Sequence, residues 1–104
     1  MGVQEVRFEF RDDELRRIHA DAGHSQKRYG PDLVRAFRKK VALLGAVSDE
    51  PELRQHRALH LEKLKGDREG QSSIRLNDQW RLILELSTDE DGRLIVIVEI
   101  VDYH

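Results

Sequence analysis

The chain has 104 residues, enough for one compact domain, and its charged residues (37%) are almost as frequent as its hydrophobic residues (38%). The net charge of -2 argues against broad, non-specific binding to nucleic acid, although a local basic patch remains possible. The absence of cysteine excludes disulfides, thiolate zinc sites and cysteine nucleophiles, and it fits a reducing compartment. We therefore expect a cytoplasmic protein, and the length predicts a single domain over residues 1–104.

The first elements in chain order are a strand and a short helix. Residues 3–10 alternate apolar and charged side chains, which predicts a strand. Asp12 or Asp13 can then cap a helix whose acidic first turn suits the helix dipole, and Gly23 ends this helix. Its apolar stripe consists of Leu15, Ile18 and Ala22.

A longer helix is predicted to begin at Pro31, a residue that suits the first helical position. Apolar side chains recur along it every three or four residues, which predicts one buried face. This face consists of Leu33, Phe37, Val41 and Leu44, and the opposite face carries Arg35, Arg38 and Lys39. Residues 48–51 end the helix, and residues 51–56 can form one short helical turn.

The second half of the chain is typical of β-strands. The predicted strands cover residues 58–64, 71–76, 80–86 and 93–103, with turns at 65–70, 77–79 and 87–92. The last strand is a continuous β-branched run, the pattern of a covered central strand. Trp80 shares the parity of Leu82 and Leu84, so we expect it in the core. The predicted class is α+β, with two N-terminal helices packed on a mainly antiparallel sheet of four to five strands.

Positive charge is concentrated in residues 53–82. This segment holds seven Lys or Arg residues and four Asp or Glu residues, a balance of +3 in a chain whose total is -2. Basic residues gathered on one sheet would form an anion-binding face. The alternative is a solvated sheet face that merely carries Lys and Arg.

The tail Asp102-Tyr103-His104 carries a second signal. Alternation along a strand points Asp102 and His104 one way and Tyr103 the other. Histidine can give and take a proton near neutral pH, so the tail is a candidate for proton transfer. The alternative is a frayed terminus without function. His56 and His60 lie four residues apart, but the segment passes there from loop to strand, so we expect no metal site and no cofactor.

Four short motifs together resemble those of a known toxin family. They are Leu-Lys-Gly-Asp-Arg (64–68), Ser-Ile-Arg (73–75), Gln-Trp-Arg (79–81) and the tail Asp-Tyr-His (102–104). In combination they resemble the HigB-type toxins of the RelE/ParE superfamily, the killer proteins of plasmid-maintenance and toxin–antitoxin modules. The resemblance is strongest over residues 59–104 and covers the first half only as architecture.

The resemblance implies a small ribonuclease that inhibits translation by cutting messenger RNA in the ribosomal decoding site. It implies that Lys65 is the lysine of the family's Leu-Lys-Gly motif and that Arg81 contacts phosphate. The tail residues 102–104 match the catalytic tail of HigB-type toxins. Glu62 stands where some HigB toxins have His, whereas the related YoeB-type toxins carry Glu at this place and use it as the general base.

RNA can be cut without metal when its own 2′-hydroxyl attacks the adjacent phosphorus, which requires a base, an acid and a fixed cation. Glu62, His104 and Arg81 are the candidates for these three roles. Flanking phosphates and a stacked base would contact a set of substrate-binding residues, namely Lys63, Lys65, Arg75 and Tyr103. Asp102 would favour the imidazolium form of His104.

Two alternatives stay open at this point. One is a ParE-like toxin that poisons DNA gyrase by protein binding without cutting RNA, and the other is a relative that only binds. The expected partners are a helix-turn-helix, HigA-like antitoxin and the ribosome with its message, with operator DNA bound only through the antitoxin. The longest aliphatic run, residues 94–98, is too short to span a membrane, so we expect no membrane contact.

Overall fold

A five-stranded sheet, in the order β1-β5-β4-β3-β2, forms the centre of the molecule. The computed structural model describes residues 6–21, 23–24, 28–47 and 50–102. The strands are β1 (Val6–Phe10), β2 (Glu62–Lys63), β3 (Ser72–Arg75), β4 (Trp80–Asp89) and β5 (Gly92–Asp102). Only β1 and β5 pair in parallel, and the other neighbours are antiparallel. This confirms the predicted α+β class with a mainly antiparallel sheet.

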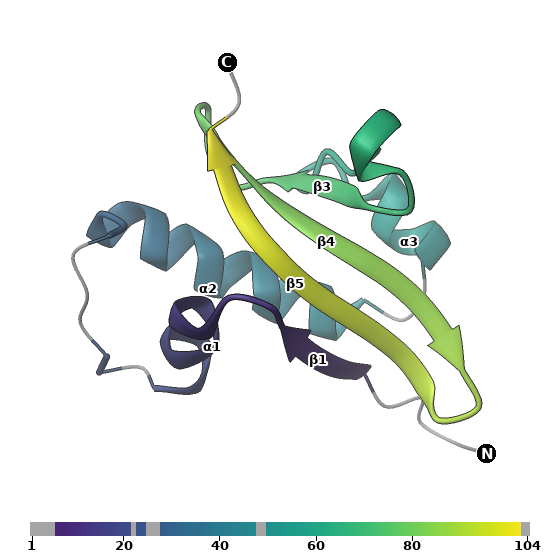
Figure 1. Cartoon of the computed structure of the whole chain (residues 1–104), viewed down its shortest axis with the longest axis horizontal. Helices are drawn as coiled ribbons and strands as arrows, with labels where there is room; N and C mark the ends of the chain where they lie inside the picture. Colours follow the sequence, from purple (N-terminus) through teal and green to yellow (C-terminus); the bar gives the residue numbers. More distant parts are fainter. Residues whose placement is uncertain (1–5, 22, 25–27, 48–49, 103–104) are drawn as a thin grey trace.

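The longest helix, α2, crosses behind β5 and covers one side of the sheet (Figure 1). The helical segments are α1 (Asp13–Ala20), α2 (Pro31–Ala46), α3 (Glu50–Gln55) and the 3₁₀ turn η1 (Gly66–Arg68). Asp12 caps α1, since its carboxylate accepts the Leu15 N–H at 3.1 Å, and Pro31 stands in the first turn of α2. Helix α1 ends at Ala20, before the predicted Gly23, and Ala22 lies outside the described residues.

The hydrophobic core lies between α2 and the face of the sheet turned toward it, which we call the helix face. The four residues of the predicted α2 stripe are all buried: Leu33, Phe37, Val41 and Leu44. The sheet contributes Ile74, Leu82, Leu84, Ile95 and Ile97, each 0% exposed. Each such side chain contributes roughly 1.5–3 kcal/mol of hydrophobic stabilisation. Trp80 is partly buried against this core, as predicted.

A bulge in β5 explains why its apolar run does not alternate. Ile83 pairs with Glu99 and the next residue, Leu84, pairs with Ile97, so Val98 has no partner in the ladder. The extra residue shifts the alternation by one position. As a result Ile97 and Ile100, three residues apart, both belong to the buried cluster beside α2.

Two further predicted boundaries are wrong. The strand expected over residues 58–64 is reduced to Glu62–Lys63, because His60 adopts φ = 46°, a left-handed conformation that interrupts an extended chain. The turn expected over 87–92 contains only Glu90 and Asp91 between strands, because β4 continues in register with β5 as far as the Asp89–Gly92 pair. Within the described residues, no helix combines the length and the apolar character needed to cross a membrane.

Candidate functional site

The candidate residues divide between the two faces of the sheet. We call the face turned away from α2 the outer face. Cross-strand partners share a face, so the pairs Glu62–Ser73, Ser73–Ile83 and Ile83–Glu99 form one row across it. Arg75 and Arg81 form the next row, together with Val101. The structure therefore brings Glu62, Arg75 and Arg81 together on one face.

Glu62 is exposed on β2, the last strand of the sheet in the part of the chain described here. Its Cα partner Ser73 is two residues from Arg75, which makes Arg75 a diagonal neighbour of Glu62. Diagonal neighbours lie about 7–8 Å apart, within reach of long side chains. A carboxylate and a guanidinium group can thus act on one small ligand at this place.

Arg81 is buried, with only 7% of its surface exposed, and it acts as a donor inside the protein. Its Nε donates to the Ser73 hydroxyl at 2.9 Å, and its Nη2 donates to the carbonyls of Ser73, at 3.2 Å, and His60. The sequence predicted a phosphate contact for this residue. Two of its donor bonds fix neighbouring backbone carbonyls, so its charge lies beneath the outer face.

Arg75 is the more accessible of the two arginines. Its Nη2 pairs with the exposed carboxylate of Asp78 in the β3–β4 turn, and its Nε donates to the Asn77 carbonyl at 3.3 Å. An exposed ion pair of this kind is weak and opens readily to another anion. Arg75 is therefore better placed than Arg81 to meet a phosphate from solvent.

A polar network crosses the outer face from the loop after β2. Arg68 lies 3.4 Å from the carboxylate of Glu99 on β5 and donates to Gln71 Oε1 at 3.1 Å. Gln71 in turn donates to Glu85 at 3.0 Å, and the Arg11 guanidinium makes a two-pronged contact with the same carboxylate at 2.7 and 2.9 Å. The Gln71 amide, followed by Arg11, lowers the pKa of Glu85. The network ties the 66–71 loop to β4 and β5, and through Glu85 to Arg11 just after β1.

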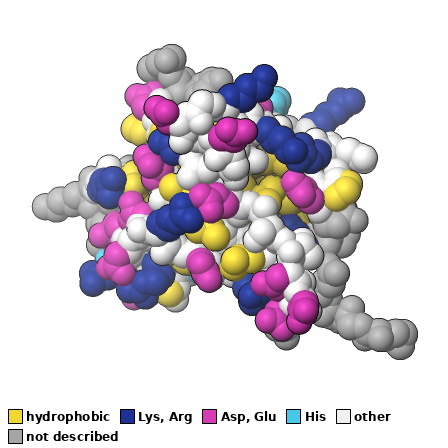
Figure 2. Space-filling model, turned by 45° about the vertical axis from the view of Figure 1, so that its right-hand side comes forward, with side chains coloured by type: hydrophobic (Ala, Val, Ile, Leu, Met, Phe, Trp, Pro, Cys, Tyr) yellow, Lys and Arg dark blue, Asp and Glu magenta, His cyan; other side chains and the backbone are white. Residues whose placement is uncertain are grey.

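The basic segment does not form a continuous basic surface. Three of its arginines pair with carboxylates, in the pairs Arg54–Glu50, Arg68–Glu99 and Arg75–Asp78. Figure 2 shows basic and acidic side chains interspersed over the visible face. The anion-binding capacity predicted from the local charge is therefore confined to a few positions.

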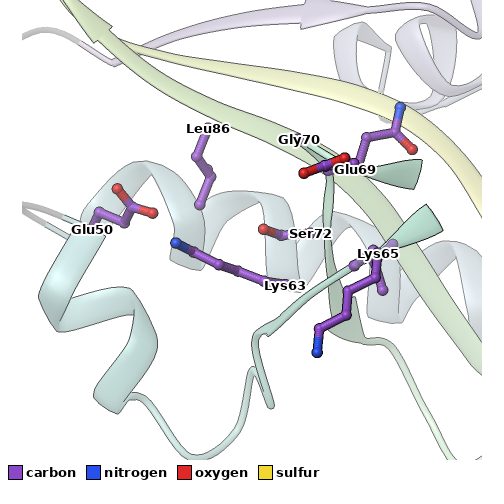
Figure 3. A pocket seen from close by; sticks show the side chains of 9 residues that line it. Glu50, Lys63, Lys65, Glu69, Gly70, Ser72 and Leu86 are labelled. Atoms are coloured by element: carbon purple, nitrogen blue, oxygen red, sulfur yellow. The ribbon is translucent and has the colours of Figure 1, made fainter. Parts of the chain in front are cut away.

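Lys63 and Lys65 line a pocket on the other side of β2 (Figure 3). The pocket has a volume of 410 Å³ and is bounded by α3, the 69–71 loop, β3 and β4. Its other lining residues include Glu50, Glu69, Ser72 and Leu86. Lys63 pairs with Ser72, which is opposite Leu84 of the core, so this pocket opens on the helix face. The two lysines are thus separated from Glu62 by the edge strand itself.

The tail is only partly described. Asp102 pairs with Trp80, whose side chain packs against the core, so the register places it on the helix face rather than with Arg81. Its carboxylate accepts a bond from Gln79 Nε2 at 3.1 Å. Tyr103 and His104 lie outside the described residues. Across the described part of the chain, no three His, Asp or Glu side chains gather as a metal site.

Comparison with known families identifies the chain. The family model described as "RelE-like toxin of type II toxin-antitoxin system HigB" matches residues 8–104. The chain belongs to this family. No curated protein matches this HigB-like toxin by sequence.

Three solved structures share the fold of this HigB-like toxin. The YoeB/ParE toxin from Agrobacterium tumefaciens superposes with a TM-score of 0.60 and 14% identity, over 94% of this chain and 99% of that chain. A chain of the YoeB-YefM complex from Staphylococcus aureus superposes with a TM-score of 0.57 and 18% identity, over 96% of this chain and 98% of that chain. YafQ from E. coli strain BL21(DE3) superposes with a TM-score of 0.57 and 9% identity, over 95% of this chain and 92% of that chain. At these identities the likeness concerns the fold alone.

Sequence reasoning missed two residues that shape the site of this HigB-like toxin. Ser73 is 1% exposed and binds the Arg81 guanidinium, and its parity with Arg75 along β3 was a usable signal. Lys40 reaches from α2 to the Ala58 carbonyl at 2.7 Å. Nothing in the sequence separates Lys40 from the exposed Lys39 beside it.

Proposed function

We propose that this chain is a ribosome-dependent mRNA endoribonuclease that inhibits translation as the toxin of a type II toxin–antitoxin system. The chain belongs to the RelE-like HigB toxins, as the family match over residues 8–104 shows. RelE-like toxins generally act as ribonucleases. The proposal adds the substrate, the ribosome and the residues that do the chemistry, within a single domain over residues 1–104.

The reaction needs no metal. A base removes the proton of a 2′-hydroxyl, and the freed oxygen attacks the adjacent phosphorus to form a 2′,3′-cyclic phosphate. An acid protonates the departing 5′-oxygen, and cations stabilise the charge that develops on the phosphoryl oxygens. Glu62 is the proposed base, Arg75 and Arg81 supply the positive charge, and His104 is the proposed acid.

The observation that carries this proposal is the outer-face arrangement of Glu62 with Arg75 and Arg81. The Glu62 carboxylate is exposed to solvent. Arg75 is its diagonal neighbour on the adjacent strand β3, and Arg81 lies opposite Arg75 on β4. A base and two cations on one face supply two of the three kinds of group that a transesterifying ribonuclease requires, and the acid is the third. A protein that only binds gyrase has no need for this combination.

The two arginines take different parts. Arg75 contacts the scissile phosphate from the surface, and opening of its pair with Asp78 accompanies this contact. The buried Arg81 contributes a fixed charge from below. Lys63 and Lys65 bind flanking phosphates where the RNA passes around the edge strand β2 into the pocket of Figure 3.

The tail supplies the remaining groups. Val101 stands opposite Arg81, so β5 ends next to the arginine pair, although Asp102 itself lies on the helix face. We assign the proton donation to His104, its support to Asp102, and stacking on an RNA base to Tyr103. The cognate antitoxin is proposed to be a HigA-like helix-turn-helix protein, through which alone the complex binds operator DNA.

The test is primer extension on a translated reporter message after induction of the toxin. The wild type should produce cleavages in the translated region, and Glu62→Gln and His104→Gln should each lower cleavage by about 10²–10⁴-fold, because each removes a proton-transfer group. Glu90→Gln is the matched control, since Glu90 is exposed in the turn after β4, away from the arginine pair. It should cut like the wild type.

The opposite result is equally informative. Growth arrest by the wild type without any cleaved message, together with trapped gyrase–DNA complexes, would replace the proposal by the gyrase-poisoning alternative. Full cleavage by Glu62→Gln would keep the class of enzyme and remove Glu62 as the base.

A further inference from the structure

Three successive backbone carbonyls just before β2 each accept a hydrogen bond from a different element. The Ala58 carbonyl accepts from Lys40 Nζ of α2 at 2.7 Å, and the Leu59 carbonyl accepts from the Arg75 N–H of β3 at 2.8 Å. The His60 carbonyl accepts from Arg81 Nη2 of β4. A loop rarely has every carbonyl of a run bound from outside, since loop carbonyls usually face water.

The turn formed by residues 58–60 is also conformationally demanding. His60 has φ = 46°, in the left-handed region that residues other than glycine seldom adopt, and Leu59 between the two side-chain bonds is 0% exposed. Such a conformation persists where the surroundings over-determine it. Lys40 from the helix side and Arg81 from the outer face supply that constraint.

The constrained turn leads directly to the candidate base. Glu62 follows His60 by two residues, and its cross-strand partner Ser73 is bound by the same guanidinium, at 2.9 Å through the hydroxyl and at 3.2 Å through the carbonyl. Arg81 therefore contacts both the turn that precedes Glu62 and the residue opposite it. A shift of the turn would displace the carboxylate.

We propose that Lys40 and Arg81 form a two-sided clamp on residues 58–60 and act as positioning residues for Glu62. This inference rests on the proposed function for its catalytic consequence, while the clamp itself is a property of the fold. Lys40 is the more informative half, because it belongs to α2 on the helix side, whereas Glu62 and Arg75 share the outer face. Partial burial lowers the pKa of Lys40.

The first experiment follows amide hydrogen exchange at Arg75, whose N–H donates to the Leu59 carbonyl and so reports on the turn without any RNA. Lys40→Met keeps the length of the side chain but removes its donors. It should speed exchange at Arg75 about tenfold while the amides of β5 stay unchanged, because one hydrogen bond on the turn is lost. The matched control is Lys39→Met, which makes the same change of charge at an exposed neighbour and should change neither.

The second experiment measures cleavage of a ribosome-bound message by the same variants. Lys40→Met should lower the maximal rate roughly tenfold, because a small displacement of a catalytic group costs rate, with the half-saturating ribosome concentration unchanged. Lys40→Arg should restore most of the rate, because a guanidinium can donate to the same carbonyl. A loss of binding instead of rate would mean that Lys40 contacts substrate and would overturn the positioning role.

The two readouts separate the possible failures. Unchanged exchange at Arg75 in Lys40→Met would overturn the clamp, whatever the enzyme does. Faster exchange with full cleavage would overturn its role in positioning Glu62. If the wild type cuts no message while exchange responds as expected, the proposed function fails and the clamp stands.

Discussion

Arg81 and Arg75 have the same side chain on the same face of adjacent strands, yet their surroundings give them different roles. Arg81 is 7% exposed and its bonded neighbours are the Ser73 and His60 backbone, whereas Arg75 pairs with an exposed carboxylate. A buried charge is retained only where its donors are satisfied. The two residues should therefore respond differently to the same substitution.

Arg81→Ala should lower the free energy of unfolding by roughly 2–3 kcal/mol, because buried acceptors on Ser73 and His60 lose their donor. Arg75→Ala should cost less than about 1 kcal/mol, since the lost ion pair with Asp78 and the lost hydrogen bond to the Asn77 carbonyl are both exposed. Urea unfolding of both variants measures the difference, and the cleavage assay should show a large loss for each. Equal stability of the two variants would contradict the assignment of Arg81 as a structural donor.

The sequence was sufficient to place Arg75 and Arg81 on the two strands of one hairpin, with Glu62 on the strand before it. Strand parity and the short turn at 77–79 determine the cross-strand neighbours within the hairpin. It was insufficient to separate the buried arginine from the exposed one. That difference depends on the turn at 58–60, where His60 leaves the extended conformation. No residue pattern around His60 predicts a left-handed non-glycine residue.

Among the elements, the 66–71 loop is tied to the sheet by side chains in addition to the backbone bond from Leu64 N–H to the Gln71 carbonyl. Gln71 contacts Glu85 of β4, and Glu85 contacts Arg11 beyond the end of β1. Both contacts favour the ionised carboxylate, so the pKa of Glu85 lies below its usual range in the folded protein. This part of the outer face should be sensitive to acid.

Glu85→Gln should destabilise the protein near neutral pH and make little difference in acid. Because the folded state binds the Glu85 proton less readily than the unfolded state, the carboxylate stabilises the fold above its unfolded pKa of about 4.3, and this contribution disappears as the pH falls through the lower folded value. Urea midpoints at several pH values between about 3 and 7 measure the effect. Glu90→Gln is the control, and a gap between wild type and Glu85→Gln that widens in acid would contradict the argument.

Element types were predictable because α2 and β5 have long, regular apolar patterns. The prediction of a strand over 58–64 was wrong because alternating apolar and charged residues do not distinguish a strand from a turn. Here Leu59 is buried within a turn, and its carbonyl accepts a hydrogen bond from Arg75 N–H. The bulge at Val98 was equally invisible, because a continuous β-branched run has no polar position to mark a change of face.

At the scale of the whole molecule, a type II toxin has to be neutralised by a protein partner until it acts. Expressed alone, the wild type should arrest growth, and co-expression of the proposed HigA-like antitoxin should restore it. Glu62→Gln should be harmless alone yet still co-purify with the antitoxin, because one exposed carboxylate changes the chemistry and leaves the fold intact. Growth curves and pull-downs provide the two measurements, and a toxic Glu62→Gln protein would contradict the assignment.

The parallel pairing of β1 with β5 has a consequence for how the protein is made. Val6 is opposite Arg93, so the first strand to leave the ribosome has to wait for the last one before its edge is joined. Closing so large a loop is slow, and until then Phe8 and Phe10 have no strand beside them. A nascent chain that stalls within β4 would therefore lack the two longest ladders of the sheet, β4–β5 and β1–β5. For the same reason, pulse-labelling during refolding should find the amides of β1 among the last to be protected.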